Sequence, residues 1–525
     1  MNPQRSFVRK IVYLVALVGL LLVLSWLGQP STGDAGGERG EEGISGLLRV
    51  PNLADLRNRY HLSETQLGEI DPAGSTIKLA TLGLRGVAAN VLWEKANNYK
   101  MKKDWTNLSA TLQQITRLEP HFVSVWRFQA WNLSYNVSTE FDDYRERYRW
   151  VIKGIDFLRE GIRRNEREPM LVWDVGWYLS HKIGVADEVK QFRRLLKEDD
   201  ETFQRWGDFR PAEERDNWLV GKDWFARAEE LVDKGADLRK TTPTVFFSHR
   251  PMSQMNYCEA LEKDGIFEER ARYAWNRAGK EWFEFGARHF MTADGKRPFH
   301  LNDVERFDGD AAKDVATLEA IEPGLRDKIR KQRYDSLTAA ERKAYDAPPQ
   351  KRSGREWELA YQVQEKLKVT HEQLARAIKG QKARDAALKL AREATDFERK
   401  ATEIRTYRNI VNFEYWRRRA QFEQSPEALA ARKYVYEGAQ AMSAGDLLKA
   451  REMYEKGFAQ WRLLFDRKDF PELKNDEALG QDLMEIVYQY RRVLDKSDKP
   501  FPKDFPLNDL LQLHEKAYKD RQGIK

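Results

Sequence analysis

The chain has 525 residues, which is too long for a single compact core and indicates two or more domains or one extended solenoid. A charged fraction of 33% stands beside an aromatic fraction of 12%, a balance that excludes a disordered chain and favours amphipathic helices. The net charge of +7 is far short of the concentrated basic face of a dedicated nucleic-acid binder. The single cysteine, Cys258, excludes an internal disulfide framework and a thiolate zinc cluster.

An uncharged and almost wholly apolar run lies near the N-terminus, from Ile11 to Leu27. Arg5, Arg9 and Lys10 precede it, whereas the first charge after it is Asp34. By the positive-inside rule, we expect a single-pass protein of the cytoplasmic (inner) membrane, with its N-terminus in the cytoplasm and its body on the periplasmic or extracytoplasmic side. As a helix the run spans roughly 25 Å, which is short but close to the usual limit for a bilayer. A cleaved signal peptide is the alternative, but no small-x-small site follows, so we favour an uncleaved anchor.

A Gly-rich polar stretch follows and predicts a flexible tether, after which apolar residues recur at steps of three and four and predict helices. We expect the first hairpin to turn near Asp104 and its second helix to end at Pro120. Pro169 closes the next pair of helices. A third hairpin is expected to follow, with Trp177 on its first helix and Phe192 on its second helix. These hairpins predict an all-α fold.

Several predicted second helices share a small–large–small triplet with steps of four and three residues. The triplets are Gly154–Leu158–Gly161, Ala228–Val232–Gly235, Ala271–Trp275–Ala278 and Ala450–Tyr454–Gly457. Small side chains let neighbouring helices approach, and the large one fills the space between repeats. With Trp126 and Ala130 in a preceding first helix, this pattern resembles the tetratricopeptide repeat (TPR). The resemblance implies a TPR-like α-solenoid of helical hairpins with a groove lined by the first helices.

A second resemblance covers the whole chain. The order of apolar run, Gly-rich tether and Trp-rich motif, His121 to Asn136, is similar to that of uncharacterised membrane-anchored proteins of planctomycete-type bacteria. This resemblance implies attachment to a membrane.

The TPR resemblance also implies a set of groove residues. They are Asn97, Arg127, Trp131, Tyr135, Trp177 and His181. This mixture of aromatic and hydrogen-bonding groups suits an extended peptide, although Trp131 and Trp177 are also the kind of residue that fills a helical core. We expect Arg127→Ala and His181→Ala to change stability by about 0.5 kcal/mol or less, as at exposed positions. We expect Gly154→Leu to cost about 1 to 3 kcal/mol through overpacking.

The C-terminal half contains a long helix. A capping box at Thr370 and Gln373 precedes apolar residues that run in steps of four and three from Leu390 to Ile404. This coiled-coil-like seam is interrupted by Arg408, whose guanidinium we expect to extend from the seam into water. We favour one arm of an intramolecular hairpin, because a dimer would oppose two copies of this charge. The dimer remains the alternative.

The predicted segments follow from these features. They are an N-terminal signal anchor or transmembrane helix (1–30), a Gly-rich tether (31–46), a Trp-rich TPR-like domain (47–290), a polar connector with a capping box at Thr338 and Glu341 (291–355), the long helix with a C-terminal TPR-like hairpin (356–495), and a Pro-containing tail with a short helix (496–525).

The eight histidines have no metal-ligand spacing, and no nucleotide-binding or nucleophile motif is present. We therefore expect no cofactor, no metal and no catalytic residue. The predicted function is a membrane-anchored scaffold or adaptor for protein–protein interaction in the cell envelope. Its expected partners are other envelope proteins or peptide segments, together with the bilayer around Ile11 to Leu27.

Two other functions remain alternatives. An envelope enzyme, such as a peptidoglycan-acting hydrolase, would be favoured by a Glu of strongly perturbed pKa in a polar cleft. A nucleic-acid-binding adaptor would use the interleaved Arg and aromatic residues of Arg147–Lys153 and Tyr415–Phe422 to stack bases. The expected exported location argues against nucleic acid.

Overall fold

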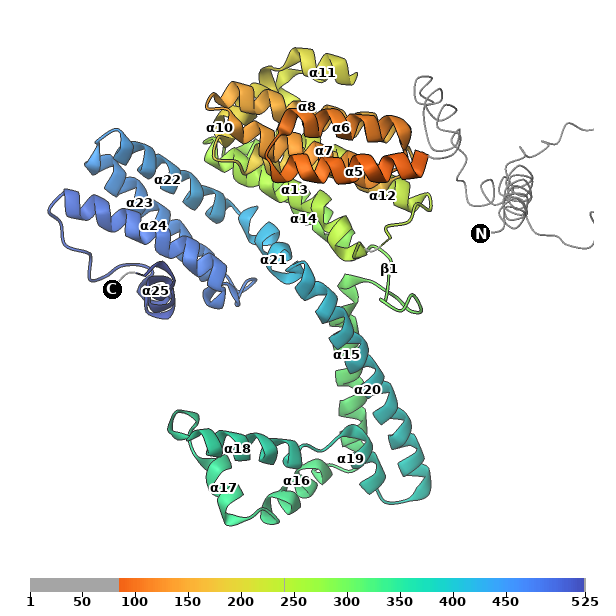
Figure 1. Cartoon of the computed structure of the whole chain (residues 1–525). Helices are drawn as coiled ribbons and strands as arrows, with labels where there is room; N and C mark the ends of the chain where they lie inside the picture. Colours follow the sequence, from red (N-terminus) through yellow and green to blue (C-terminus); the bar gives the residue numbers. More distant parts are fainter. Residues whose placement is uncertain (1–84, 240, 524–525) are drawn as a thin grey trace, which may run out of the picture. The chain divides into compact units, whose positions relative to one another are not determined.

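The computed structural model describes residues 85–239 and 241–523. The expected anchor and tether, residues 1–46, lie outside these ranges. Within them, no helix is both long and apolar enough to cross a bilayer. The described chain is all-α apart from one short pair of strands (Figure 1), and it divides into two compact units, residues 1–240 and 241–525. The division falls inside the range 47–290, which the sequence pattern groups as one domain.

Unit 1 consists of helical hairpins. Its elements are α5 (Arg85–Met101), α6 (Trp105–Leu118), α7 (Val123–Trp131), the π-helix η1 (Asn132–Val137), η2 (Ser138–Glu140), α8 (Tyr144–Arg164), α9 (Pro169–Trp177), the π-helix η3 (Tyr178–Lys182), α10 (Val189–Glu198), α11 (Asp200–Trp206), η4 (Ala212–Glu214) and α12 (Asn217–Asp233). Helix α5 packs on α6, α7 on α8, and α9 on α12. The Asp104 side chain accepts a hydrogen bond from the backbone N–H of Asn107 and caps α6, where the first hairpin was expected to turn.

The third hairpin differs from the prediction. Phe192 lies on α10, but the partner of α9 is α12, with α10 and α11 inserted between them in sequence. The pairing depends on two glycines, because a Cβ added at Gly221 would lie 3.0 Å from the carbonyl oxygen of Gly176. No other residue permits so close an approach of the two backbones without a shift. Helices α10 and α11 are therefore an insertion between the two helices of one hairpin.

The triplet predicted in α12 is displaced by seven residues, about two helical turns, from the set that is buried. Gly235 follows the end of the helix with φ +95° and is exposed, so it makes no helix contact. The buried small–large–small set is instead Gly221, Phe225 and Ala228, which has the same steps of four and three. Sequence spacing alone cannot separate these two registers, because Ala228 belongs to both.

Unit 2 contains the remaining helices and the strands. Its elements are α13 (Pro243–Lys263), α14 (Glu269–Gly286), β1 (Phe290–Met291), β2 (Pro298–Phe299), η5 (Leu301–Asp303), α15 (Val304–Ile321), α16 (Leu325–Asp335), α17 (Ala339–Asp346), η6 (Pro349–Lys351), α18 (Gly354–Leu367), α19 (His371–Ala377), α20 (Gln381–Ile410), α21 (Phe413–Glu423), α22 (Pro426–Ser443), α23 (Leu447–Phe465), η7 (Leu473–Asn475), α24 (Glu477–Lys496) and α25 (Asn508–Gln522). The strands are antiparallel, with Phe290 opposite Phe299. Helices α13 and α14, and α22 and α23, form further hairpins.

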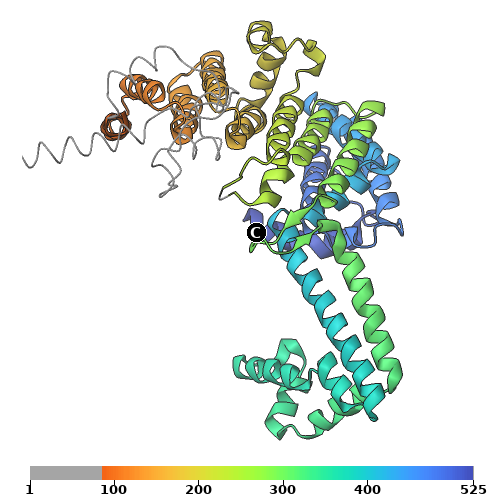
Figure 2. The same cartoon turned by 90° about the vertical axis from the view of Figure 1, so that its right-hand side faces the viewer.

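Helices α15 and α20 lie side by side as an arm that carries α16 to α19 at its far end (Figures 1 and 2). This arrangement confirms the intramolecular hairpin predicted for the long helix. The capping box at Thr370 and Gln373 also forms, but it opens the short helix α19. Gly380, with φ +85°, then turns the chain into α20, so the expected single helix is two helices.

The position of Arg408 corrects the prediction that its guanidinium reaches water. The residue is only 3% exposed, and its Nε donates to the carbonyl oxygen of Leu301 at 2.6 Å. Its other nitrogens pair with Glu305, at 2.7 Å, and with Glu414. The charge is stabilised inside the protein because carboxylates from α15 and α21 face it where the arm joins the rest of unit 2.

Candidate functional site

Two nine-residue segments of unit 1 share one pattern. Ala130–Ser138 reads AWNLSYNVS, and Gly176–Gly184 reads GWYLSHKIG. In each segment an α-helix passes into a π-helix directly after the Trp. Such π-turns are rare and occur often at functional sites. The sequence analysis missed this internal repeat, and a comparison of the chain with itself at an offset of 46 residues reveals it.

The repeated serines explain why both segments pack alike. Ser134 and Ser180 are buried, and each faces a glycine of the second helix. A Cβ at Gly154 would lie 2.0 Å from the Ser134 Oγ, and a Cβ at Gly221 would lie 2.3 Å from the Ser180 Oγ. The close helix contact therefore holds each segment against its second helix in the same way.

Four of the predicted groove residues occupy equivalent positions in these segments and meet one another. Trp131 stacks on Tyr135 with ring centroids 6.2 Å apart, and Trp177 stacks on His181 at 4.4 Å. The Tyr135 hydroxyl lies 3.5 Å from the His181 Nδ1, which joins the two pairs. Trp131 is 41% exposed, so this ring is not part of a sealed core.

The contacts continue in both directions along the first helices. Phe128 connects Trp131 to Trp93 of α5, and Trp173 stacks on Trp177 with centroids 5.5 Å apart. We call this set the aromatic row, and its members are Trp93, Phe128, Trp131, Tyr135, His181, Trp177 and Trp173. The row crosses the first helices of all three hairpins of the described part of unit 1.

Polar groups modify the centre of the row. The Lys182 Nζ lies 4.6 Å from the centroid of the Tyr135 ring. Burial lowers the pKa of His181, and Lys182 lowers it further, so the imidazole is neutral at pH 7 and offers one donor and one acceptor. The row therefore combines flat apolar surface with hydrogen-bonding atoms.

Arg127, another predicted groove residue, contacts the neighbouring hairpin. Its guanidinium makes a bidentate ion pair with Asp174 of α9, with distances of 2.5 and 3.0 Å. The Asp174 side chain is only 7% exposed, and burial raises the pKa of its carboxyl although Arg127 opposes the shift. Arg127 is thus a clamp between two hairpins, and its loss would leave a buried acid without its partner. Asn97 is exposed on α5 and lies outside the row as defined.

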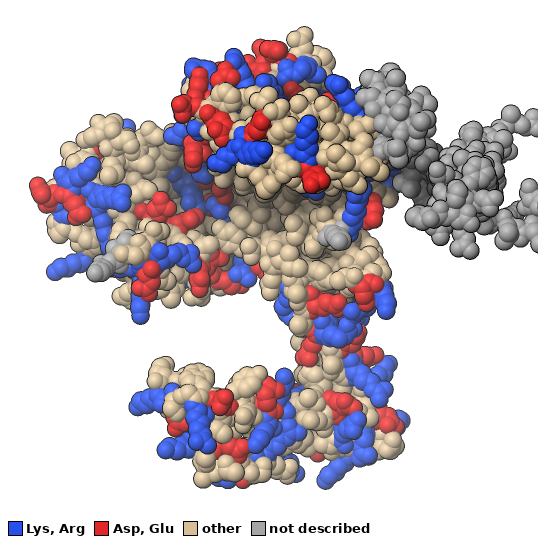
Figure 3. Space-filling view, viewed as in Figure 1, with Lys and Arg blue, Asp and Glu red and all other residues tan. Residues whose placement is uncertain are grey.

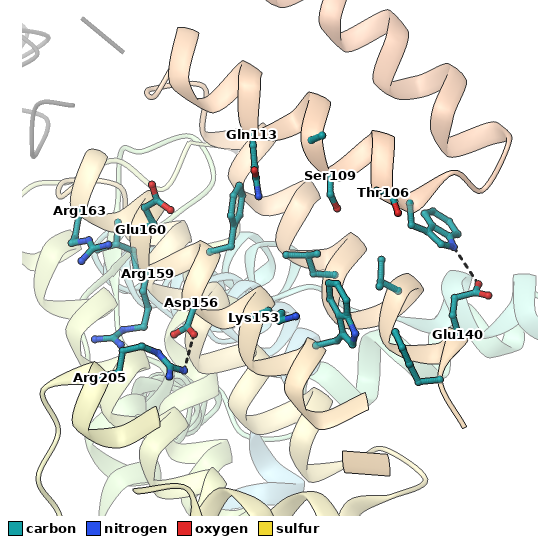
Figure 4. Close-up of a pocket in the computed structure, with 18 of the residues that line it drawn as sticks. Thr106, Ser109, Gln113, Glu140, Lys153, Asp156, Arg159, Glu160, Arg163 and Arg205 are labelled. Carbon is teal, nitrogen blue, oxygen red and sulfur yellow. Dashed lines mark hydrogen bonds and ion pairs between the residues drawn. The ribbon is translucent and has the colours of Figure 1, made fainter. Parts of the chain in front are cut away.

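A cleft of about 1050 Å³ lies elsewhere on unit 1 (Figure 4). Helices α6 and α8 supply most of its lining, and η1, η2, α11 and α12 supply the rest. None of the six predicted residues lines this cleft. The sequence analysis missed it because its lining comes from six separate elements.

The two ends of the cleft differ in charge. Arg159, Arg163 and Arg205 lie at one end together with Asp156 and Glu160, and Asp156 pairs with Arg205 at 2.9 Å (Figure 4). Glu140 lies at the other end, where it accepts a hydrogen bond from the Trp105 Nε1 at 3.2 Å. Burial lowers the pKa of Arg159 to about 10. Its Nε is buried and has no hydrogen-bond partner among the described residues.

The perturbed carboxylate that would favour an enzyme lies in unit 2. Burial, and then repulsion by Glu423, raise the pKa of Glu262 to about 7. Glu262 accepts a hydrogen bond from the Trp275 Nε1 at 2.8 Å, and Glu423 pairs with Arg432 at 2.6 Å. These groups form a charged cluster among α13, α14, α21 and α22, and Glu262 lines none of the clefts described for this protein. The cluster is a packing feature and not an open polar cleft.

Four of the five arginines in the two candidate base-stacking segments make ion pairs. Arg147 pairs with Glu188 and Arg149 with Glu146, while Arg417 pairs with Glu305 at 3.0 Å and Arg419 with Glu259 at 2.9 Å. In the described ranges, no group of His, Cys, Asp and Glu is arranged to hold a metal ion. No protein-family model matches the chain, and no curated protein matches it.

Proposed function

We propose that this protein is a membrane-anchored scaffold of the cell envelope that binds an extended segment of a partner protein along the aromatic row. The observation that carries the proposal is the equivalence of the two segments, Ala130–Ser138 and Gly176–Gly184, whose aromatic side chains form a connected row with Trp131 and His181 exposed and Tyr135 and Trp177 half-buried. Repeated units that present equivalent side chains suit a partner that is itself extended.

The chemistry of the row supports a peptide as the ligand. Tyr and Trp provide large, rigid contact area, and they dominate the binding energy of protein interfaces. His181 and Tyr135 add donors and acceptors that fix the register of a peptide backbone. The close helix contacts at Gly154 and Gly221 support a TPR-like solenoid, because they place the row on the first helices, as the repeat family does.

The membrane topology is part of the proposal. The apolar run Ile11 to Leu27 and its basic flank place the described body on the extracytoplasmic side. A reporter that is active only in the cytoplasm, fused after Lys525, is expected to be silent. An active reporter would contradict the proposed envelope location while leaving the peptide-binding proposal intact.

Site-specific photo-crosslinking tests the binding surface. A photoreactive residue at Tyr135 is expected to give a discrete adduct in intact membranes, and a matched residue at Tyr273 of α14, which is 68% exposed, is expected to give none. Trp131→Ala combined with Trp177→Ala should reduce the adduct at least tenfold, as expected when hot-spot aromatics are removed at about 1.4 kcal/mol or more. Equal adducts at both positions, or an adduct that survives this change in a folded protein, would refute the proposal.

A further inference from the structure

The positive charge of the chain is concentrated at the end of the arm. Residues 325–384 contain 16 Lys and Arg against 8 Asp and Glu, whereas the rest of the chain contains 74 against 75. This segment comprises α16 to α19 and the first residues of α20, and we call it the basic lobe. Its net charge of +8 exceeds that of the whole chain, +7. Lys and Arg are spread over the face of the lobe that Figure 3 shows.

Arginines and lysines of the lobe have different roles. Arginine side chains hold its turns together by donating to backbone carbonyl oxygens, as Arg326 does to Val369 at 2.6 Å and Arg352 to Tyr345 at 2.7 Å. The lysines are different, because most of them are exposed and have no ion-pair partner among the described residues. These lysines are Lys328, Lys331, Lys343, Lys351, Lys368, Lys379 and Lys382. The lobe thus has a set of free cations that its own fold does not use.

Two of the eight acidic residues of the lobe serve its own helix caps. Glu341 and Glu356 each complete a capping box at the start of a helix. Glu341 also pairs with Lys366, and that hydrogen bond and those to Thr338 lower the pKa of its carboxyl to about 2. These two carboxylates are held at the helix starts, and the lobe as a whole keeps its net charge of +8.

Two large aromatic side chains lie among the charges. Trp357 is 51% exposed and Tyr361 is 67% exposed, and they follow one another by one turn on the same face of α18. Trp and Tyr favour the boundary between headgroups and acyl chains, because each has an apolar body and a polar edge. An exposed pair of this kind beside free lysines matches an anionic bilayer surface in both charge and polarity.

We propose that the basic lobe docks on an anionic lipid surface, with Trp357 and Tyr361 at the headgroup boundary and the free lysines against the lipid phosphates. The arm supports this role, because the 30 residues of α20 extend over about 45 Å and hold the lobe away from the helical hairpins of unit 2. A lipid surface fits better than nucleic acid. The lysines lie on separate elements and not along a groove that tracks a phosphate backbone. The inference does not depend on the aromatic row.

Vesicle flotation with the full chain tests the proposal. The protein is held in nanodiscs of phosphatidylcholine, so that any membrane-spanning segment is already occupied, and is mixed with vesicles of phosphatidylcholine alone or with phosphatidylglycerol added. We expect flotation only with the anionic vesicles and its loss at about 0.5 M salt, where the Debye length is only a few Å. Lys328→Gln, Lys331→Gln, Lys343→Gln and Lys351→Gln together should weaken binding far more than tenfold, because each lysine contributes about fivefold, or roughly 1 kcal/mol.

Matched variants separate the lobe from general charge and hydrophobicity. Lys263→Gln with Lys280→Gln changes exposed lysines outside the lobe, and Tyr273→Ser matches Trp357→Ser with Tyr361→Ser. The lobe variants should lose vesicle binding at an unchanged melting temperature, and the matched variants should retain it. Equal losses in both sets, or wild-type binding by the lobe variants, would overturn the proposal. Tighter binding to a duplex or single-stranded oligonucleotide than to anionic vesicles would also overturn it, in favour of nucleic acid.

Discussion

The hairpins of the aromatic row in unit 1 and the C-terminal hairpin of unit 2 pack their helices through the same pattern of small and large residues, but the tryptophans differ in exposure. Both have small–large–small triplets in their second helices, at Gly154–Leu158–Gly161 and Ala450–Tyr454–Gly457. In unit 1, Trp131 is 41% exposed, whereas Trp461 of α23 is fully buried in a core cluster to which α24 contributes Leu483 and Val487. The hairpin contact alone does not decide whether an aromatic residue is core or surface. A further covering helix decides it.

The ion-paired arginines of the two units also differ in their surroundings. In unit 2, the Arg432 guanidinium lies 5.0 Å from the centroid of the buried Trp461 ring and pairs with Glu423, whose side chain is 0% exposed. In unit 1, Arg127 pairs with Asp174 beside the row, and its own side chain is 43% exposed. We infer that the unit 2 cluster serves stability, while the unit 1 surface is available for binding. Four predictions test this contrast.

The largest effect is expected from Arg432→Ala. This change leaves the buried Glu423 with only Arg419, at 3.7 Å, and should lower the free energy of unfolding by about 3 kcal/mol or more. The matched change Arg451→Ala, in an exposed pair with Glu455, should cost no more than about 1 kcal/mol. Urea denaturation measures both. Similar losses in the two variants would remove the distinction between structural and surface charge.

The free energy of unfolding should depend on pH through Glu262. Its pKa is about 7 in the folded protein and near the ordinary value of 4.5 when unfolded, so the folded state holds the proton more tightly. The stabilisation is complete below pH 4.5 and is lost as the pH rises through about 7, with a slope of at most about 1.4 kcal/mol per pH unit. Glu262→Gln keeps an acceptor oxygen for Trp275 and should flatten the stability profile between pH 5 and 7. An unchanged profile would show that Glu262 titrates normally.

Gly154→Ala tests the contact that orients the row. The added Cβ would lie 2.8 Å from the carbonyl oxygen of Ala130, so the backbone must move, at a cost of about 1 to 3 kcal/mol. Gly438→Ala in unit 2 places its Cβ 3.1 Å from the Tyr454 ring and 3.3 Å from the carbonyl oxygen of Ala450, and it should cost less than about 1 kcal/mol because these contacts need a shift of only a few tenths of an ångström. Thermal melting compares the two. A larger loss at Gly438 would contradict the tighter packing inferred for unit 1.

The smallest effect on stability is expected from Trp131→Ala, at about 0.5 kcal/mol or less, because the residue is 41% exposed and lies outside the buried core. Arg127→Ala should cost more, about 1 kcal/mol, because it removes the partner of the buried Asp174. Chemical denaturation of both variants gives the comparison. The reverse order would make Trp131 a core residue and Arg127 a free surface residue.

Local interactions were predictable from the sequence alone. Asp104 and Thr338 cap helices as their side chains require, since the groups that they bind lie only three residues away. The all-α class follows from apolar steps of three and four, and the close contact at Gly154 follows from small residues in a helical pattern. Four of the six predicted groove residues meet in one row because they occupy repeated positions on first helices, where side-chain direction depends on helix geometry.

The tertiary structure decided what depends on distant partners. Three contacts show this: α9 pairs with α12 across two inserted helices, Arg408 is buried against Glu305, and Arg127 pairs with Asp174. Each joins residues of separate helices that are not adjacent in sequence. The cleft in unit 1 likewise combines six elements that share no sequence signal. Periodicity reports which face of a helix is apolar, but not which surface covers it. The covering surface decides whether a tryptophan or an arginine is buried or available to a partner.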